Sequence, residues 1–262
     1  MVRPKKYLGQ HFLTDPSIAR RIVDSLDPDP GDYVIEVGPG TGVLTGLLLD
    51  RNIRLVPIEI DPESVRHLLN KWPALKDSIV EGNFLDFELK SFTAERVHII
   101  GNFPYNISSQ IFFKIIGDRQ QVSSVVCMLQ KEVADRIVSP PGSRDYGILS
   151  VLVQAFFEAR RLFHVKPGSF HPSPRVMSGV IRLERNHTDT LSCDEELFFR
   201  VVKTVFNQRR KMIRNSIRSI LLNLGSDFEL LSKRPEQLDV QQFIDLTCWV
   251  KEQQVINRDR SS

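Results

Sequence analysis

Apolar residues along the chain follow two kinds of pattern. Short continuous runs are typical of strands buried on both faces, whereas spacings of three and four residues predict amphipathic helices. Seven strands are predicted, at residues 32–37, 54–61, 78–84, 96–103, 123–130, 158–167 and 176–185. The helices are predicted at residues 14–26, 43–51, 62–72, 108–117, 131–139 and 147–158. This alternation indicates an α/β fold with a mostly parallel, doubly wound sheet.

The last two predicted strands break the alternation. Only the segment "GSFHPSPR" separates them, which is too short for a crossover helix, so we expect them to pair antiparallel. After the linker "RNHTDTLS", Ser192 and Glu195 form a capping box that starts a helical segment. We therefore expect a first domain at residues 1–185 and a small, all-helical second domain at residues 192–262.

Composition narrows the class of protein. The net charge of +3 over 262 residues is too mild to indicate nucleic-acid binding without a local cluster. The three cysteines are an odd number and form no CxxC pair, which argues against a disulfide framework and for a reducing compartment. The six histidines have no metal-ligand spacing, and no apolar run approaches a membrane span. We expect a cytoplasmic protein with no metal and no membrane partner.

A glycine-rich turn follows the first predicted strand. The turn "GPGTG" starts at Gly38, and Glu59 at the end of the second strand lies 19 residues after Gly40. A carboxylate in that place binds ribose hydroxyls, but the spacing G-x-G-x-x-G of a pyrophosphate site is lost because Val43 stands in the third glycine position. The pattern favours an adenosine ligand without phosphates, of which S-adenosyl-L-methionine is the common one. A tight corner with no ligand is the alternative for the turn alone.

The fourth predicted strand ends in "NFPY", residues 102–105. The Asn102 carboxamide oxygen and the Phe103 carbonyl can both accept hydrogen bonds from one exocyclic amine. Pro104 fixes the backbone and Tyr105 offers a ring for stacking. An adenine presented by its amino edge fits these groups, whereas the alternative is an Asn102 turn cap with Tyr105 in the core.

These motifs resemble those of the ribosomal RNA adenine dimethyltransferases of the KsgA type. The "NFPY" run is similar to the N-[LIP]-P-Y motif of adenine-N6 methyltransferases. Further similar stretches occur in the same order: "LGQHFL", "VIEVGPGTGVLT", "IEID", "MLQKEVADRI", "YGILSVL", "VKPGSFHPSPRVMSGVIRL" and "FNQRRKMIRNSI". The resemblance implies a Rossmann-like S-adenosylmethionine-dependent methyltransferase domain and a helical RNA-binding domain.

The resemblance also implies roles for individual residues. The cofactor would contact His11, Leu13, Gly38, Glu59, Asn83 and Asn102. The target base would contact Asn102, Phe103, Pro104, Tyr105 and, on its other side, Phe170. For Phe170, packing between two strands is the alternative. The family usually has Asn at the position of His11 and Asp at that of Asn83.

A basic run lies in the second domain. Between Arg200 and Arg218 there are seven basic residues and no acidic one. The candidate RNA contacts are Arg209, Arg210, Lys211, Arg214 and Arg218. Arg210, Arg214 and Arg218 recur every four residues, which predicts one helical face, with Ile213, Ile217 and Leu221 packing inward. A solvated face is the alternative, and Arg3, Lys5 and Lys6 predict a mobile basic arm.

The resemblance implies a monomeric enzyme that dimethylates two adjacent adenines in a loop near the 3′ end of small-subunit (16S) rRNA. Its partner would be the RNA of the small-subunit precursor. One alternative is an Erm-type enzyme acting on large-subunit rRNA. Another is an assembly factor that binds rRNA without catalysis.

Overall fold

In a computed structural model, the chain divides into two compact units. The structure describes residues 2–186, 188–221, 224 and 228–259. Unit 1 comprises residues 1–135 and 158–185, and unit 2 comprises residues 136–157 and 186–262. Residues 136–157 thus group with the C-terminal residues, whereas the sequence analysis assigned them to the first domain.

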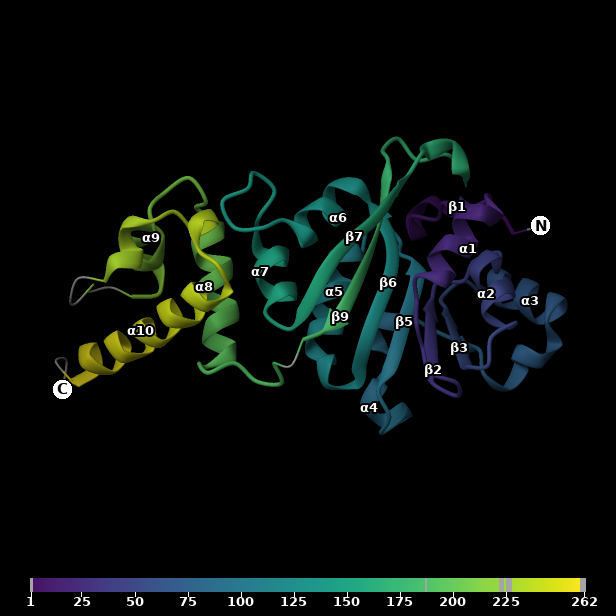
Figure 1. Cartoon of the computed structure of the whole chain (residues 1–262), viewed down its shortest axis with the longest axis horizontal. Coiled ribbons are helices and arrows are strands. Elements are labelled where there is room, and N and C mark those ends of the chain that lie inside the picture. Colours follow the sequence, from purple (N-terminus) through teal and green to yellow (C-terminus); the bar gives the residue numbers. More distant parts are fainter. Residues whose placement is uncertain (1, 187, 222–223, 225–227, 260–262) are drawn as a thin grey trace. The chain divides into compact units, whose positions relative to one another are not determined.

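A seven-stranded sheet forms the frame of unit 1, in the order β4-β3-β2-β5-β6-β9-β7 (Figure 1). These strands are β2 (Tyr33–Val37), β3 (Arg54–Glu59), β4 (Val80–Glu81), β5 (Val97–Asn102), β6 (Val122–Gln130), β7 (Phe157–Val165) and β9 (Ser178–Arg185). Two further strands, β1 (Phe12–Leu13) and β8 (Phe170–His171), pair antiparallel as a separate small sheet. The predicted α/β fold with seven strands is confirmed, including the antiparallel end of the sheet, where β9 lies between β6 and β7 and runs antiparallel to β6.

The strand order reverses at β2. β3 and β5 lie on its two sides, and both run parallel to it. The strand that ends in "NFPY" therefore lies beside the strand that leads into the glycine turn. In open parallel sheets, this switch point is the edge at which ligands bind.

Helices connect the strands, and the short helix at Leu89–Phe92 is the one in the following set that was not predicted. They are α1 (Pro16–Asp24), α2 (Val43–Leu48), α3 (Pro62–Lys71), α4 (Leu89–Phe92), α5 (Ser108–Gly117) and α6 (Lys131–Val138). α1 begins where it does because the Asp15 side chain accepts the N–H groups of Ser17 and Ile18, with Pro16 in the first turn. Asp61 and Pro62 start α3 in the same way. On one face of the sheet, α1, α2 and α3 bury Ile22, Leu44 and Leu68.

Unit 2 is helical in its C-terminal part. Its helices are α7 (Ile148–Gln154), α8 (Glu195–Phe206), α9 (Ile213–Ser216) and α10 (Val240–Asp259). Short 3-10 turns in the two units are Lys6–Leu8, Pro73–Asp77, Phe84–Asp86, Arg119–Gln121, Pro167–Ser169, Ile217–Ser219, Glu229–Ser232 and Pro235–Gln237. α8 packs on both α7 and α10. This packing, with a hydrogen bond from the Gly142 N–H to the Glu236 carbonyl, explains why residues 136–157 belong to this unit.

Three local predictions for unit 2 are wrong. The cap of α8 is Asp194 and not Ser192, because the Asp194 carboxylate accepts the Leu197 N–H at 3.0 Å. The helix predicted over residues 147–158 ends at Gln154, since Phe157 already starts β7. The predicted arginine face is broken, because α8 stops at Phe206 and a turn precedes α9.

The inward packing predicted for the same region is confirmed. Ile213, Ile217 and Leu221 are buried. Within the described residues, no helix is both long enough and apolar enough to cross a membrane.

Gly101 lies where β5 approaches β2 most closely. A Cβ atom at Gly101 would stand 2.5 Å from the carbonyl oxygen of Val37, which is backbone and cannot move aside. We expect Gly101→Ala to lower the free energy of opening β2 and β5 by about 1–3 kcal/mol, as for other overpacked cores. Native-state hydrogen exchange of the two strands measures this change.

Gly117→Ala is the matched control. A Cβ atom at Gly117 meets no other atom within 4 Å. The substitution should leave stability unchanged or raise it by about 0.4–1 kcal/mol. Equal effects of the two substitutions would contradict the close-approach explanation.

Candidate active site

A glycine, a carboxylate and an amide lie in one row at the carboxyl edge of the sheet. Val37 pairs with Ile58 of β3 and with Gly101 of β5. The next residue of each strand is therefore at the same level, and these residues are Gly38, Glu59 and Asn102. Three of the residues predicted for the site are thus neighbours because of strand register.

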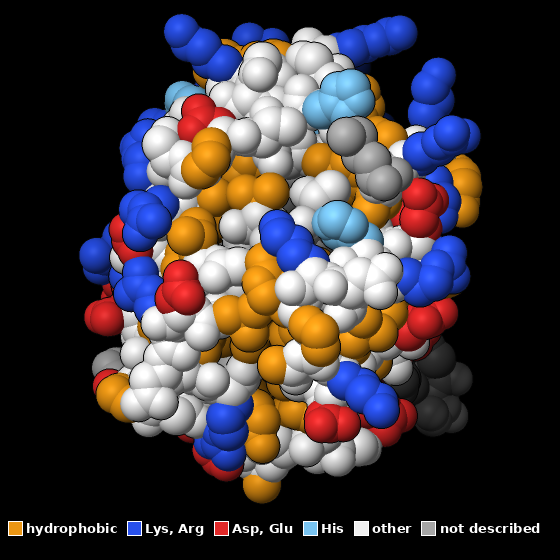
Figure 2. Space-filling view, turned by 90° about the vertical axis from the view of Figure 1, so that its right-hand side faces the viewer, with side chains coloured by type: hydrophobic (Ala, Val, Ile, Leu, Met, Phe, Trp, Pro, Cys, Tyr) orange, Lys and Arg blue, Asp and Glu red, His pale blue; other side chains and the backbone are white. Residues whose placement is uncertain are grey.

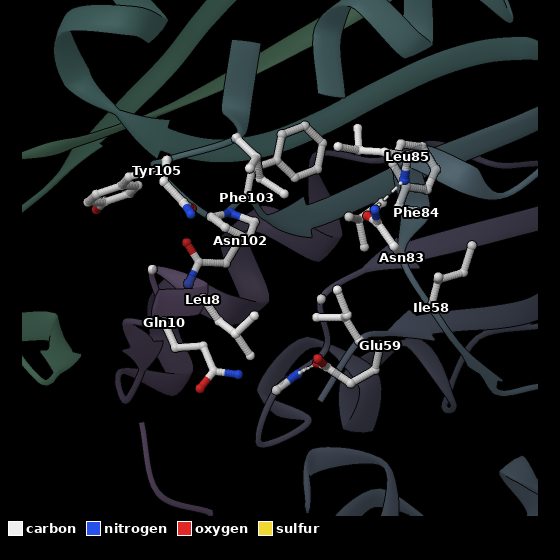
Figure 3. Close-up of a pocket in the computed structure, with 18 of the residues that line it drawn as sticks. Leu8, Gln10, Ile58, Glu59, Asn83, Phe84, Leu85, Asn102, Phe103 and Tyr105 are labelled. Atoms are coloured by element: carbon white, nitrogen blue, oxygen red, sulfur yellow. Dashed lines mark hydrogen bonds between the residues drawn. The ribbon is translucent and has the colours of Figure 1, made fainter. Parts of the chain in front are cut away.

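A cavity of about 330 Å³ lies over this row. Its walls come from the N-terminal segment, the ends of β2, β3 and β5, and the turn after β4. Figure 3 shows Glu59 and Asn83 on one side of the cavity, with Asn102 and Tyr105 on the other. The volume falls in the range of small-ligand sites.

Glu59 is a buried carboxylate with both oxygens oriented. Oε2 accepts the Gly40 N–H at 2.9 Å, and Oε1 accepts the Asp61 N–H at 2.9 Å. Burial raises the pKa of Glu59, and these backbone hydrogen bonds oppose the rise. Each oxygen keeps a further lone pair, so the carboxylate can also accept two hydroxyl groups.

The glycine turn leaves room for a ligand at its first position. Gly38 has φ +66°, which disfavours other residues, and no atom stands within 4 Å of the place of a Cβ atom. Gly40 has φ +58°, and a Cβ atom there would collide with the Phe12 ring at 2.8 Å. An open turn beside a hydroxyl-binding carboxylate fits the adenosine part of S-adenosylmethionine. Contact of the cofactor with Gly38 and Glu59 stays a prediction.

Asn83 borders the cavity after β4. Its Oδ1 accepts the Leu85 N–H at 3.1 Å, and its Nδ2 donates to Asp86 at 3.0 Å. One amide hydrogen and one lone pair are left for an adenine edge. The predicted contact of Asn83 with the cofactor is compatible with this geometry and stays a prediction.

The "NFPY" run presents two oxygen acceptors. Asn102 Nδ2 donates to the His11 carbonyl at 2.7 Å, which fixes the amide and turns Oδ1 to the other side. The Phe103 N–H donates to the Met128 carbonyl at 2.9 Å, and its ring is buried against Phe112. Within residues 2–186, neither Asn102 Oδ1 nor the Phe103 carbonyl accepts a hydrogen bond. The pair fits one amine donor.

Tyr105 and His11 are fixed relative to each other. The Tyr105 hydroxyl shares a hydrogen bond of 2.5 Å with the Ser178 hydroxyl, and burial raises its pKa, so it stays a neutral phenol. The His11 ring lies 5.3 Å from the Tyr105 ring, and its Nδ1 donates to the Pro172 carbonyl at 2.7 Å. His11 borders the cavity as expected, but its polar contacts are with Asn102 and Pro172.

Two predicted residues lie elsewhere. Leu13 and Phe170 face each other in the β1–β8 pair, and each is only 5% exposed in the core. Neither borders the cavity, because the small sheet turns both side chains inward. The Leu13 and Phe170 side chains therefore do not line this cavity, and their contacts with the cofactor and the target base stay predictions.

Contacts of Lys5 and Gln10 with Asp61, which we name the latch, fix the N-terminal segment. The prediction of a mobile arm is therefore wrong for Lys5. The Lys5 ammonium pairs with Asp61, whose side chain is fully buried, and Gln10 Nε2 donates to the same carboxylate at 3.3 Å. The pairing raises the pKa of Lys5. Burial of Asp61 acts against its ionisation, but the hydrogen bonds from Lys5, Glu63 and Gln10 prevail and lower its pKa.

This contact could not be predicted from the sequence, because Lys5 and Asp61 lie 56 residues apart and no local pattern links them. The carboxyl group must be ionised and the amine protonated, so the pair is fully formed between pH values near 3.8 and 10.5. It weakens as pH falls through the lowered pKa of Asp61 or rises through the raised pKa of Lys5.

The predicted RNA contacts lie in unit 2. Arg210, Lys211, Arg214 and Arg218 are exposed. Arg209 is half-buried and donates to the Ser143 carbonyl at 3.1 Å, so part of its function is structural. RNA binding by these five residues stays a prediction.

We expect Lys5→Met to weaken cofactor binding, because the latch holds a wall of the cavity. The dissociation constant should rise about tenfold, the size expected when about one tenth of the molecules keep the segment closed. Isothermal titration calorimetry with S-adenosylmethionine measures it. Lys5→Arg should retain affinity, and Lys6→Met is the control at an exposed neighbour. Equal affinity of Lys5→Met and wild type would disprove the function of the latch.

The chain is similar to a known family of RNA-modifying proteins over most of its length. The family described as "Ribosomal RNA adenine dimethylase" matches residues 1–242. The chain is 50% identical to "Ribosomal RNA small subunit methyltransferase A" of Phocaeicola vulgatus, over 96% of this chain and 91% of that protein. It is 49% identical to the protein of the same name from Bacteroides thetaiotaomicron, over 96% of each.

Two solved structures have the same fold. A dimethyladenosine transferase from Plasmodium falciparum has a TM-score of 0.76 at 22% identity, over 93% of this chain and 98% of that one. The 23S rRNA methyltransferase ErmE has a TM-score of 0.65 at 26% identity, over 92% and 99%. Because the family match spans most of the chain and relatives share about half of its residues, the protein belongs to the ribosomal RNA adenine dimethylase family of methyltransferases.

Proposed function

We propose that the protein transfers methyl groups from S-adenosyl-L-methionine to the N6 amines of two adjacent adenines in small-subunit (16S) rRNA. The adenines lie in a loop near the 3′ end, and the products are N6,N6-dimethyladenosines made during small-subunit biogenesis. The observation that carries the proposal is the pair of oxygen acceptors, Asn102 Oδ1 and the Phe103 carbonyl, beside the cavity over Gly38 and Glu59.

The two acceptors act on the amine of the target base. The N6 nitrogen is a poor nucleophile because its lone pair is delocalised into the ring. Two hydrogen bonds, to Asn102 and Phe103, draw the amine toward tetrahedral geometry and localise that lone pair. When bound, S-adenosylmethionine supplies an electrophilic methyl group. Positioning and electrostatics then carry catalysis, without a covalent enzyme intermediate.

Binding of the N6 amine in this way depends on the orientation of the Asn102 amide. Its Nδ2 is occupied by the His11 carbonyl, so Oδ1 and not the amide N–H meets the amine. Tyr105, fixed by Ser178, offers a neutral ring on which the base can stack. A duplex base cannot reach these groups, so the target must be unstacked from a loop or flipped.

The choice of RNA rests on the relatives and on charge. Relatives of about 50% identity carry the name of a small-subunit methyltransferase. The exposed basic residues of unit 2 suit phosphate contacts. We propose that the protein acts as a monomer in the cytoplasm, on precursors of the small subunit.

Mass spectrometry of rRNA tests the proposal. Small and large subunits without the modification are incubated with the protein and labelled S-adenosylmethionine. We expect two adjacent labelled dimethyladenosines in small-subunit rRNA. Label in large-subunit rRNA would support the Erm-type activity instead, and background label in both would indicate a non-catalytic assembly factor.

Asn102→Ala should abolish most of the transfer while cofactor affinity stays close to that of wild type. A loss of about 10²–10³-fold in the single-turnover rate is expected, by analogy with the removal of one positioned hydrogen-bonding group. Quench-flow methylation and calorimetry measure the two quantities. Turnover at the wild-type rate would refute the assignment of Asn102 as an acceptor for the amine.

A further inference from the structure

We propose that the loop between β7 and β9 is a surface that binds the RNA strand beside the target base. We name residues 166–177 the proline loop. The inference rests on the proposed function and deepens it, because it assigns the contact on the catalytic unit itself. Phe170 is buried within this loop, whereas several of its neighbours in the loop are exposed.

The proline loop is tied down along its length. The Ser169 carbonyl accepts the N–H and the hydroxyl of Thr14, at 2.8 and 3.0 Å. The Pro172 carbonyl accepts His11 Nδ1, and the Met177 carbonyl accepts the Lys131 N–H at 2.9 Å.

A hydrogen bond of 2.9 Å from the Ser173 hydroxyl to the Pro167 carbonyl closes the loop on itself. β8, within the loop, pairs with β1. A surface held in this way loses little conformational entropy when a partner binds.

Two of the exposed side chains of the loop are cationic. Lys166 and Arg175 are exposed, and residues 166–177 contain no Asp or Glu. Neither cation has a salt bridge in the described part of unit 1. By contrast, Arg160 and Arg161 on the preceding strand pair with Glu158 and Asp135. Two unpaired cations on a rigid loop are suited to phosphate groups.

Apolar side chains lie next to these cations. Val176 is 46% exposed and Met177 is 36% exposed, directly after Arg175. Unstacked nucleotides present both phosphates and base faces, which fits a surface of cations beside apolar side chains. Figure 2 shows Lys and Arg side chains projecting at the top of this face of the molecule, the end at which Figure 1 places the proline loop.

The loop is joined directly to the base-binding motif. Ser178, the residue after the loop, shares its hydroxyl hydrogen bond with Tyr105. His11 joins the loop to Asn102 through Pro172 on one side and its own carbonyl on the other. An RNA strand bound by Lys166 and Arg175 therefore lies next to the two acceptors of the "NFPY" motif. The partner is single-stranded RNA flanking the target adenines.

The test compares the double variant Lys166→Ala/Arg175→Ala with wild type. Binding is measured against salt concentration, on isolated small-subunit rRNA and on unmodified small subunits. We expect weaker binding of both and a salt slope reduced by about 1.4, since each single-strand phosphate contact contributes about 0.7. The charge-preserving variant Lys166→Arg/Arg175→Lys should restore most of the slope.

Arg160→Ala is the matched control, because Arg160 is exposed on β7 but paired with Glu158. It should keep the wild-type slope, and cofactor affinity of the double variant by calorimetry should match wild type. An unchanged salt slope in the double variant would overturn the inference. A loss of binding confined to intact subunits would also overturn it, since it would indicate a ribosomal protein as the partner. Failure of the proposed function is separate: wild type would then transfer no methyl group to small-subunit rRNA.

Discussion

The register between three parallel strands is the constraint on which the site depends. Because Val37 stands opposite both Ile58 and Gly101, the residues after them emerge together at one edge of the sheet. Gly38 leaves open space, and Glu59 and Asn102 place a carboxylate and an amide oxygen beside it; in the proposed function these groups bind ribose hydroxyls and the target amine. A slip of one residue in β3 or β5 would turn these side chains to the opposite face and divide the site. The absence of a side chain at Gly101 lets β2 and β5 approach closely enough to keep this row.

The N-terminal segment completes the site from above the row. It is fixed to the cofactor side by the Lys5 and Gln10 contacts with Asp61, whose N–H in turn orients Glu59. It is fixed to the base side by the His11 carbonyl, which binds the Asn102 amide. One segment of chain therefore supports both substrates, and the orientation of Asn102 depends on a backbone group 91 residues away in sequence.

What could be predicted from the sequence was local or periodic. The strands, most of the helices, the glycine turn and the "NFPY" motif at the end of a strand follow from patterns within a few residues. Much of what could not be predicted depends on contacts between distant segments. Phe170 is buried because β8 pairs with β1, some 158 residues earlier, as the register of Phe170 with Leu13 and His171 with Phe12 requires. Lys5 is held by Asp61, and the arginine face is broken because α8 ends at Phe206, before Arg210. No pattern in a single sequence reports such contacts.

A structure of the protein with S-adenosylhomocysteine and an RNA fragment containing the target adenines tests the central claim most directly. The adenine N6 should lie about 2.7–3.2 Å from both Asn102 Oδ1 and the Phe103 carbonyl, with Nδ2 still bound to the His11 carbonyl. A structure in which N6 lies away from the end of β5, or in which the Asn102 amide is reversed, would contradict it.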